Sequence, residues 1–213
     1  FLEDPLRAIR IARFMTYPHL QAFSIDNSTM RMLEQIANSG ELSKLSKDRI
    51  WIEIDRSLQS PFATKFFKLI LDFNLQDPWL SDLVNPNCNA KTSAKIKWAE
   101  LESKNNFTLG KNIPVPNNFK LYAKLLEALL KFKTDAAEKD IIKYIEQVNF
   151  HRNQIEIKEL LELKILSDNK DFITRLGANL VAEDFTILQE VNKNEIKDVK
   201  LQLIKKAIIN TNE

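Results

Sequence analysis

Carboxylate and guanidinium side chains lie close together at the start of the chain, at Glu3, Asp4, Arg7 and Arg10. A carboxylate only accepts hydrogen bonds, whereas a guanidinium only donates them, in a planar fork. Side by side, the two groups present an acceptor edge next to a donor edge, which is what pairing with the edge of a nucleobase requires. The same residues also fit a helix N-cap with a surface ion pair one turn later, which contributes under about 1 kcal/mol. Spacing alone favours this second interpretation.

These side chains need a helix to position them, and Asp4-Pro5 predicts where it begins. Asp is a preferred N-cap because its side chain accepts hydrogen bonds from the free amides of the first turn, and proline at the next position has no amide to lose. Apolar residues then follow the helical period as far as Tyr17-Pro18. The same reasoning predicts further helices over residues 28–38 (with Gly40 as its C-terminal cap), 46–58, 61–73, 94–105, 116–133, 136–149, 155–166, 170–181 and 193–209, with a frayed polar tail after Ile209.

Composition favours an all-α protein of nine to eleven helices. The 213 residues include only three glycines, which strand-rich folds need for hairpin turns and bulges. A net charge of +2 is too small to indicate a nucleic-acid partner without local clusters. A single cysteine excludes an internal disulfide and a cysteine-based zinc site. No stretch approaches the roughly 20 apolar residues of a membrane span, so a cytoplasmic location is expected.

Two segments carry a resemblance to a known family. EDPLRAIRIARF, followed by GELSKLSKDRIWIEI, resembles the class II tRNA nucleotidyltransferases, which are the CCA-adding enzymes and their bacterial poly(A) polymerase relatives. In that family the first segment is a motif of the neck domain with the form EDxxRxxRxxRF, and the second is the helix that braces it. The resemblance implies a neck domain over residues 1–75 and a C-terminal helical body and tail over residues 76–213. The irregular stretch DPWLSDLVNPNCNAKTS lies just after this boundary.

The resemblance also implies roles for particular residues. Asp4 and Arg7 match the side chains that pair with the Watson–Crick edge of the incoming CTP or ATP and so act as a protein template. Glu3 matches the neighbour that helps to hold Arg7, and Arg10 matches a position at the nucleotide site. The bracing helix contributes Arg49 and Glu53 as structural support, with Trp51 on its core side.

A catalytic head of mixed α/β type precedes the neck in this family. Its two DxD carboxylates hold Mg²⁺ for in-line attack by the tRNA 3′ hydroxyl on the α-phosphate. No residues of this sequence match that head. We therefore expect a neck-plus-C-terminal fragment with no catalytic residue and no metal site, which is inactive alone.

The segments KIKWAELESKNNF and IPVPNNFKLYAKLLEALLKF are similar in layout to the HD-type phosphohydrolase domain of some bacterial CCA-adding enzymes. Ser103 and Lys104 stand where that domain would have its His-Asp pair, and the only histidines, His19 and His151, lie elsewhere. Ser and Lys cannot build an imidazole–carboxylate metal site. The second half is therefore either a degenerate HD-like scaffold or an unrelated helical body.

Lysines beyond the neck are candidates for tRNA contact, because backbone phosphates require only suitably spaced positive charge. An ordinary solvated face, with Glu100 and Glu102 as compensating acids, explains them equally well. The candidates form two groups, Lys91, Lys95, Lys97 and Lys104, and Lys120, Lys124, Lys131 and Lys133.

Three functions remain open from the sequence. The first is a part of a CCA-adding enzyme that selects CTP and ATP and helps to dock tRNA. The second is a fragment of a bacterial poly(A) polymerase, which shares the neck motif; Trp51 and the non-basic ending IINTNE favour CCA addition. The third is a helical interaction module in which EDPLR is an ordinary capped helix.

Overall fold

The structure is a computed structural model that describes residues 4–89, 91–133 and 136–212. Ten α-helices and five short 3-10 helices occur in these ranges, and none of the residues described there is in a strand. The predicted all-α fold is therefore confirmed. Within the same ranges, no helix combines the length and the apolar character that crossing a membrane requires.

The chain divides into two compact units, residues 1–124 and 125–213. The first unit contains α1 (Leu6–Phe14), η1 (Pro18–Leu20), α2 (Asn27–Ser39), η2 (Glu41–Lys44), α3 (Lys47–Leu58), α4 (Ala63–Asp72), α5 (Ala94–Lys104) and η3 (Leu109–Lys111). The boundary falls inside α6 (Asn117–Leu129). The second unit continues with α7 (Glu138–Val148), α8 (Gln154–Leu160), η4 (Lys164–Asn169), α9 (Lys170–Ala182), η5 (Phe185–Gln189) and α10 (Ile196–Asn212).

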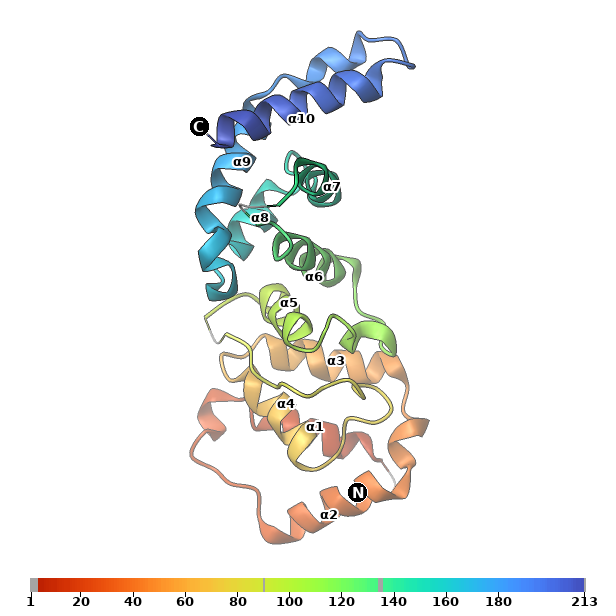
Figure 1. The fold of residues 1–213 in the computed structure, drawn as a ribbon. Helices are drawn as coiled ribbons and strands as arrows, with labels where there is room; N and C mark the ends of the chain where they lie inside the picture. The colour runs from red at the N-terminus through yellow and green to blue at the C-terminus, as the bar shows by residue number, and fades with distance from the viewer. Residues whose placement is uncertain (1–3, 90, 134–135, 213) are drawn as a thin grey trace. The chain divides into compact units, whose positions relative to one another are not determined.

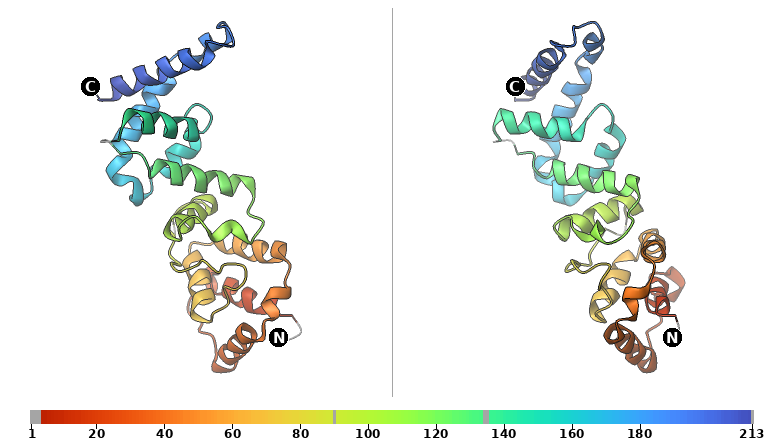
Figure 2. Two further views of the ribbon diagram at one scale, coloured as in Figure 1. Left: turned by 45° about the vertical axis from the view of Figure 1, so that its right-hand side comes forward. Right: turned by 90° about the vertical axis from the view of Figure 1, so that its right-hand side faces the viewer.

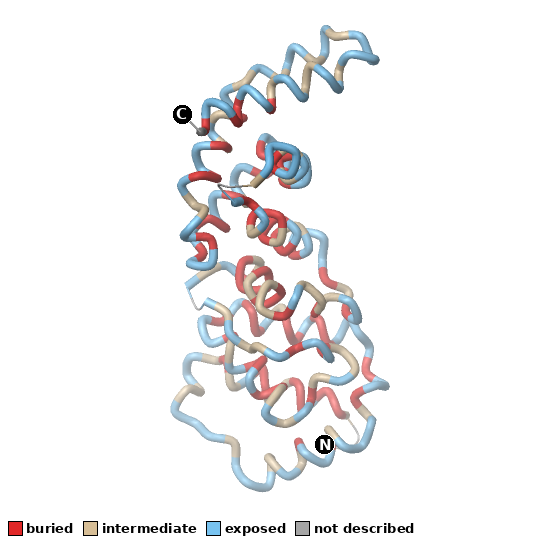
Figure 3. The backbone as a smooth tube through the Cα atoms, viewed as in Figure 1, coloured by how far each residue is buried: buried red, intermediate tan, exposed pale blue. Residues whose placement is uncertain are grey.

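In the first unit, α1 packs against α3 and α4, and α3 also packs against α5 (Figure 1). Helices α1, α3 and α4 each turn an apolar stripe inward. Figure 3 shows the corresponding buried segments alternating with exposed ones. Trp51 of α3 lies at the centre of one part of this core. Its ring makes edge-to-face contacts with Trp98 at 5.3 Å and Phe119 at 5.1 Å between centroids. The prediction that Trp51 faces the core is confirmed, since it is buried.

Helix α2 shows clear end signals. The Asp26 side chain accepts hydrogen bonds from the amides of Ser28 and Thr29 at 2.9 and 3.1 Å. Hydrogen bonds from the Ser28 and Thr29 side chains, together with these amides, lower the pKa of Asp26. Gly40 ends the helix with φ +72°, a left-handed conformation that favours glycine and confirms the predicted cap.

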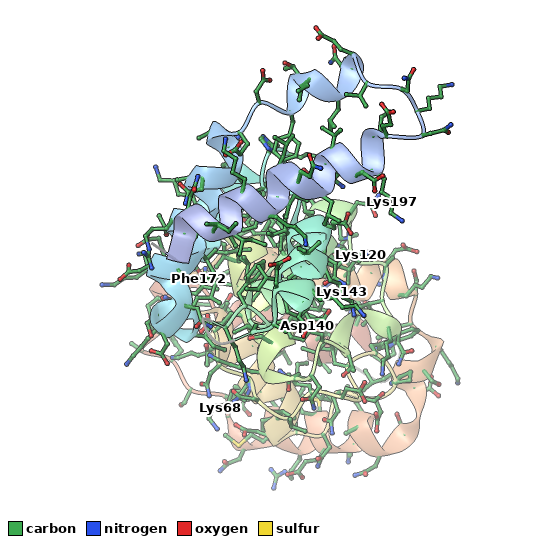
Figure 4. All side chains as sticks on the ribbon, turned by 45° about the horizontal axis from the view of Figure 1, so that its top comes forward. Lys68, Lys120, Asp140, Lys143, Phe172 and Lys197 are labelled. Carbon is green, nitrogen blue, oxygen red and sulfur yellow. The ribbon has the colours of Figure 1, made fainter. Side chains whose placement is uncertain are left out.

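In the second unit, α10 packs against α9 and α7, as the two further views in Figure 2 also show. The core includes Phe172 and Leu176 of α9, and Figure 4 labels Phe172 among the side chains of this unit. The prediction of a frayed tail after Ile209 is wrong. Helix α10 continues to Asn212, and Thr211 is buried, with its hydroxyl donating to the Ala207 carbonyl at 2.7 Å.

Candidate functional site

Helices α1 and α3 lie side by side. The polar contacts between them pair the residues of one helix with those of the other in the same order along the sequence. The Asp4 carboxylate, just before α1, lies 3.4 Å from Nη2 of Arg49 in the first turn of α3. Further along, the Ser60 hydroxyl donates to the Thr16 carbonyl at 2.5 Å. Because low numbers pair with low and high with high, the two helices run parallel. Residues of the two resemblance segments therefore meet along a single seam.

The buried carboxylate of Glu53 is at the centre of this seam. It is 2% exposed, and its two oxygens contact two different guanidinium groups of α1. Oε1 lies 3.3 Å from Nε of Arg10, and Oε2 lies 2.5 Å from Nε of Arg13. A buried carboxylate is tolerated when it is paired and hydrogen-bonded in this way. Arg13 also donates through Nη1 to the Tyr17 hydroxyl oxygen.

Arg10 connects this buried pair to the chain's start. Its Nη1 lies 3.7 Å from Asp4 Oδ2, while its Nε contacts Glu53. A continuous series of charged contacts thus runs from Arg49 through Asp4 and Arg10 to Glu53, and on to Arg13. We call these five residues the charge network.

The expected side-chain cap by Asp4 is wrong. The structure assigns the N-cap of α1 to Pro5 and gives it no side-chain hydrogen bond. The physical reason is competition: the Asp4 carboxylate faces the guanidinium groups of Arg49 and Arg10. Only its backbone carbonyl takes part in the helix start, accepting from the Arg7 amide at 3.0 Å.

Arg7 follows one turn after Asp4, and its side chain is exposed. The structure therefore brings Asp4, Arg10, Arg49 and Glu53 into direct contact, and Arg7 lies at the surface beside the same turn. Glu3, predicted to support Arg7, lies outside the described residues. Sequence reasoning missed Arg13 as a member of the network. The signal was present in the three-residue spacing of Arg10 and Arg13, which makes them neighbours on the helix surface.

The candidate tRNA lysines differ in their surroundings. The prediction for Lys97 is wrong, because its side chain is buried and its Nζ donates to the carbonyls of Leu58 at 3.0 Å and Ser60 at 2.7 Å. Desolvation by burial lowers the pKa of Lys97. The Lys95 ammonium lies 5.5 Å from the centroid of the Tyr122 ring. Exposed side chains are found at Lys91, Lys120 (labelled in Figure 4) and Lys124.

The two segments compared above with an HD-type domain contain no histidine. The Ser103 hydroxyl donates to the Glu100 carbonyl at 2.7 Å, and Lys104 pairs with the Glu100 carboxylate at 2.8 Å. In the part of the chain that the structure describes, no three His, Cys, Asp or Glu side chains cluster in a way that could hold a metal ion.

Glu102 has a structural role in this region. Its two oxygens accept hydrogen bonds from the amides of Leu109 and Gly110, each at 3.0 Å, and burial raises the pKa of Glu102. Gly110 comes so close that an added Cβ would lie 3.0 Å from this carboxylate.

Comparison with known proteins bears directly on the first unit. A family model described as the probable RNA- and SrmB-binding site of polymerase A matches residues 22–85, which include Arg49 and Glu53. The CCA-adding enzyme of Alteromonas mediterranea is 41% identical over 83 residues, which are 39% of this chain and 21% of that protein. Over this stretch the chain is similar to a bacterial CCA-adding enzyme.

Two further CCA proteins are similar to the chain at a comparable level of identity. The multifunctional CCA protein of Pasteurella multocida is 39% identical over 70 residues, 33% of this chain and 17% of that protein. The CCA-adding enzyme of Hamiltonella defensa is 44% identical over 71 residues, again 33% and 17%. The match thus spans about a fifth of the length of these CCA proteins. No solved structure shows a significant match to the chain.

Proposed function

We propose that this chain is part of a cytoplasmic tRNA nucleotidyltransferase that adds CCA to the tRNA 3′ end, and that its first unit selects CTP and ATP. The observation that carries the proposal is the charge network, which holds Asp4 between two guanidinium groups beside the exposed Arg7. The relatives named CCA-adding enzyme support the reaction.

Base chemistry explains how such a pair would select. Cytosine and adenine each present an exocyclic amine beside an unprotonated ring nitrogen, whereas uracil and guanine present a carbonyl oxygen beside a ring N–H. A carboxylate that accepts from the amine and a guanidinium that donates to the ring nitrogen match the first two bases and oppose the others. A carboxylate has about four acceptor positions, so contact with Arg10 and Arg49 leaves Asp4 able to accept from a base.

The other expected roles follow from this assignment. Arg10 lies at the nucleotide site, Arg49 and Glu53 give structural support, and Glu3 supports Arg7. In this proposal residues 1–75 act as the neck and residues 76–213 as the C-terminal body. Lys91, Lys95, Lys120 and Lys124 contact tRNA phosphates. The resemblance implies that the Mg²⁺ ligands belong to the catalytic head of this family, and we derive no step through the ion.

The test is nucleotide incorporation by the full-length protein on tRNA lacking its 3′ end, with each of the four nucleotides supplied separately. We expect Arg7→Ala to reduce discrimination of CTP and ATP against UTP and GTP by about 1–3 kcal/mol, because the donor edge is lost. Arg7→Lys should also lose discrimination, since an ammonium lacks the planar fork. Arg31→Ala, which removes an exposed arginine of α2, is the matched control. Equal selectivity in wild type and Arg7→Ala would contradict the template.

A bacterial poly(A) polymerase is the second candidate, because the matching family model is described as part of polymerase A. The same experiment separates the two functions. Incorporation of A alone would favour the polymerase, and incorporation of neither C nor A would favour a helical interaction module.

A further inference from the structure

Three rings lie together at the C-terminal end of α1 and just after it, on residues that the proposed template does not use. The centroids of Phe14 and Tyr17 are 5.6 Å apart, and those of Tyr17 and His19 are also 5.6 Å apart. Phe14 is 41% exposed and His19 is exposed, while Tyr17 between them is half-buried. We call these three residues the aromatic ladder. Large apolar rings at a surface are informative when they form a patch.

Contacts with neighbouring side chains hold the aromatic ladder in place. The Arg13 guanidinium carbon lies 4.5 Å from the centroid of the Phe14 ring, and its Nη1 donates to the Tyr17 hydroxyl. Glu53 fixes Arg13 in turn. The backbone after α1 is held by the Gln21 side-chain amide, which donates to the carbonyls of Met15 at 2.9 Å and Tyr17 at 2.8 Å. A surface ordered in advance loses little conformational entropy when it binds a ligand.

The charge around the ladder favours an anionic ligand. Residues 5–25 contain three arginines and one histidine and no Asp or Glu. Two acids contact this segment: Glu53 of α3 is buried and paired with Arg10 and Arg13, and the Asp4 carboxylate lies 3.7 Å from Nη1 of Arg10. A purely apolar protein partner would not require such a segment. Unpaired nucleotides combine flat π-faces with negative phosphates, and both features match the ladder.

We propose that the aromatic ladder is a stacking platform for unpaired nucleotides of an RNA strand. The inference rests on the proposed function, in that it takes RNA to be a ligand of this unit, and it deepens that function by naming where a single strand binds. Phe14, Tyr17 and His19 lie outside the stretch matched by the RNA-binding family model, residues 22–85. Bases stacked in a duplex cannot offer their faces, so the platform distinguishes single strands from paired RNA.

The test is equilibrium binding of the full 213-residue chain to a fluorescent oligocytidine RNA of about eight nucleotides, within the site size of single-strand binders. A duplex RNA of the same length is the parallel ligand. We expect Phe14→Ala and His19→Ala each to weaken single-strand binding at least about fivefold, the lower end of the effect of losing one stacked base, and to leave duplex binding unchanged. Phe14→Tyr, which keeps a ring, should bind as wild type does.

The control variant is Phe62→Ala, because Phe62 is also an exposed aromatic of the first unit (38% exposed), has a lysine ammonium 6.0 Å from its ring centroid and lies outside the ladder. Thermal unfolding of each variant verifies that the fold is retained. Three results would overturn the platform: no single-strand binding by wild type, an equal loss on duplex, or wild-type binding by Phe14→Leu. The last would identify an apolar docking surface for protein instead.

The two proposals fail independently. Ladder variants that bind single strands normally, alongside an Arg7→Ala effect on nucleotide choice, would remove the platform and leave the template. The reverse pattern would keep the platform as an RNA site and remove the template.

Discussion

Among single residues, Glu53 decides the geometry of the first unit's charged seam, because one buried carboxylate satisfies two guanidinium groups. Taking charges out of water costs several kcal/mol per ion, so such a cluster persists only while every member has a partner. Removing one member leaves the others buried and unpaired. The network is therefore more sensitive to truncation than a surface ion pair.

The first prediction follows from this sensitivity. Glu53→Gln keeps the shape of the side chain but removes its charge, leaving Arg13, which is 8% exposed, without a counter-ion. We expect the free energy of unfolding to fall by about 3–5 kcal/mol, measured by urea denaturation. Asp72→Asn removes an exposed pair with Lys68 in the same unit and should cost at most about 1 kcal/mol. Similar losses in both variants would mean that the buried cluster does not hold α1 against α3.

A second prediction concerns Glu102. Burial raises its folded-state pKa above the ordinary value of 4.5, so the folded state holds the proton more tightly than the unfolded chain does. The associated stability is fully present below about pH 4.5 and is lost as the pH rises through the folded pKa. Urea midpoints of wild type and Glu102→Gln, measured from pH 4 to 8, should therefore differ in slope, with wild type losing more stability as pH rises. A constant difference at every pH would contradict the assignment.

Between elements, α5 fixes the C-terminal end of α3 through Lys97. The last carbonyls of a helix have no hydrogen-bond donor within the helix. The Lys97 ammonium donates hydrogen bonds to the carbonyl of Leu58, at the end of α3, and to that of Ser60, two residues later. A lysine stem crossing an apolar interior to reach such carbonyls stabilises the junction of the two helices.

Lys97→Met tests this contact, because it keeps an unbranched apolar stem and removes the donor. We expect a loss of about 1–3 kcal/mol in the free energy of unfolding, since the two carbonyls stay buried without their partner. Lys95→Met, two residues away on the same helix and half-buried, is the control and should change stability by less than about 1 kcal/mol. Equal stability of wild type and Lys97→Met would show that water replaces the ammonium.

Periodicity predicted the helices well because it reports local geometry, and every helix expected from the sequence has a counterpart among the described residues. The burial of individual side chains by tertiary packing was harder to predict from the sequence. AKIKWAELESK reads as a polar helix, yet Lys97, Trp98 and Glu102 are all buried by packing against other elements. The Arg13–Glu53 contact joins residues 40 positions apart, which no local spacing can predict. The resemblance named Asp4, Arg49 and Glu53 as candidates, whereas only the coordinates reveal the contacts that link them through Arg10.

At the scale of the whole molecule, the two compact units offer different probes of unfolding. All three tryptophans, Trp51, Trp79 and Trp98, lie in the first unit, whereas both units contain helices. Tryptophan fluorescence therefore follows the first unit, and far-ultraviolet circular dichroism follows both.

This difference gives a prediction about cooperativity. Leu176→Ala empties a fully buried site in the second unit and should cost about 2–5 kcal/mol there. We expect the circular dichroism transition to broaden toward lower urea while the fluorescence midpoint stays in place. Leu33→Ala, at a fully buried site of the first unit, should shift the fluorescence midpoint. A common shift of both signals in both variants would mean that the chain unfolds as one cooperative body.

The parallel seam of α1 and α3 also has an evolutionary consequence. Replacing the carboxylate at position 53 alone leaves cations stranded, and replacing Arg13 alone leaves an anion stranded, so either first step lowers fitness through stability. A lineage can therefore lose or gain this ion pair only if both residues change together, or if the protein is stable enough to tolerate the single replacement. Among related sequences, an arginine at position 13 and an acid at position 53 should consequently be inherited or lost as a pair.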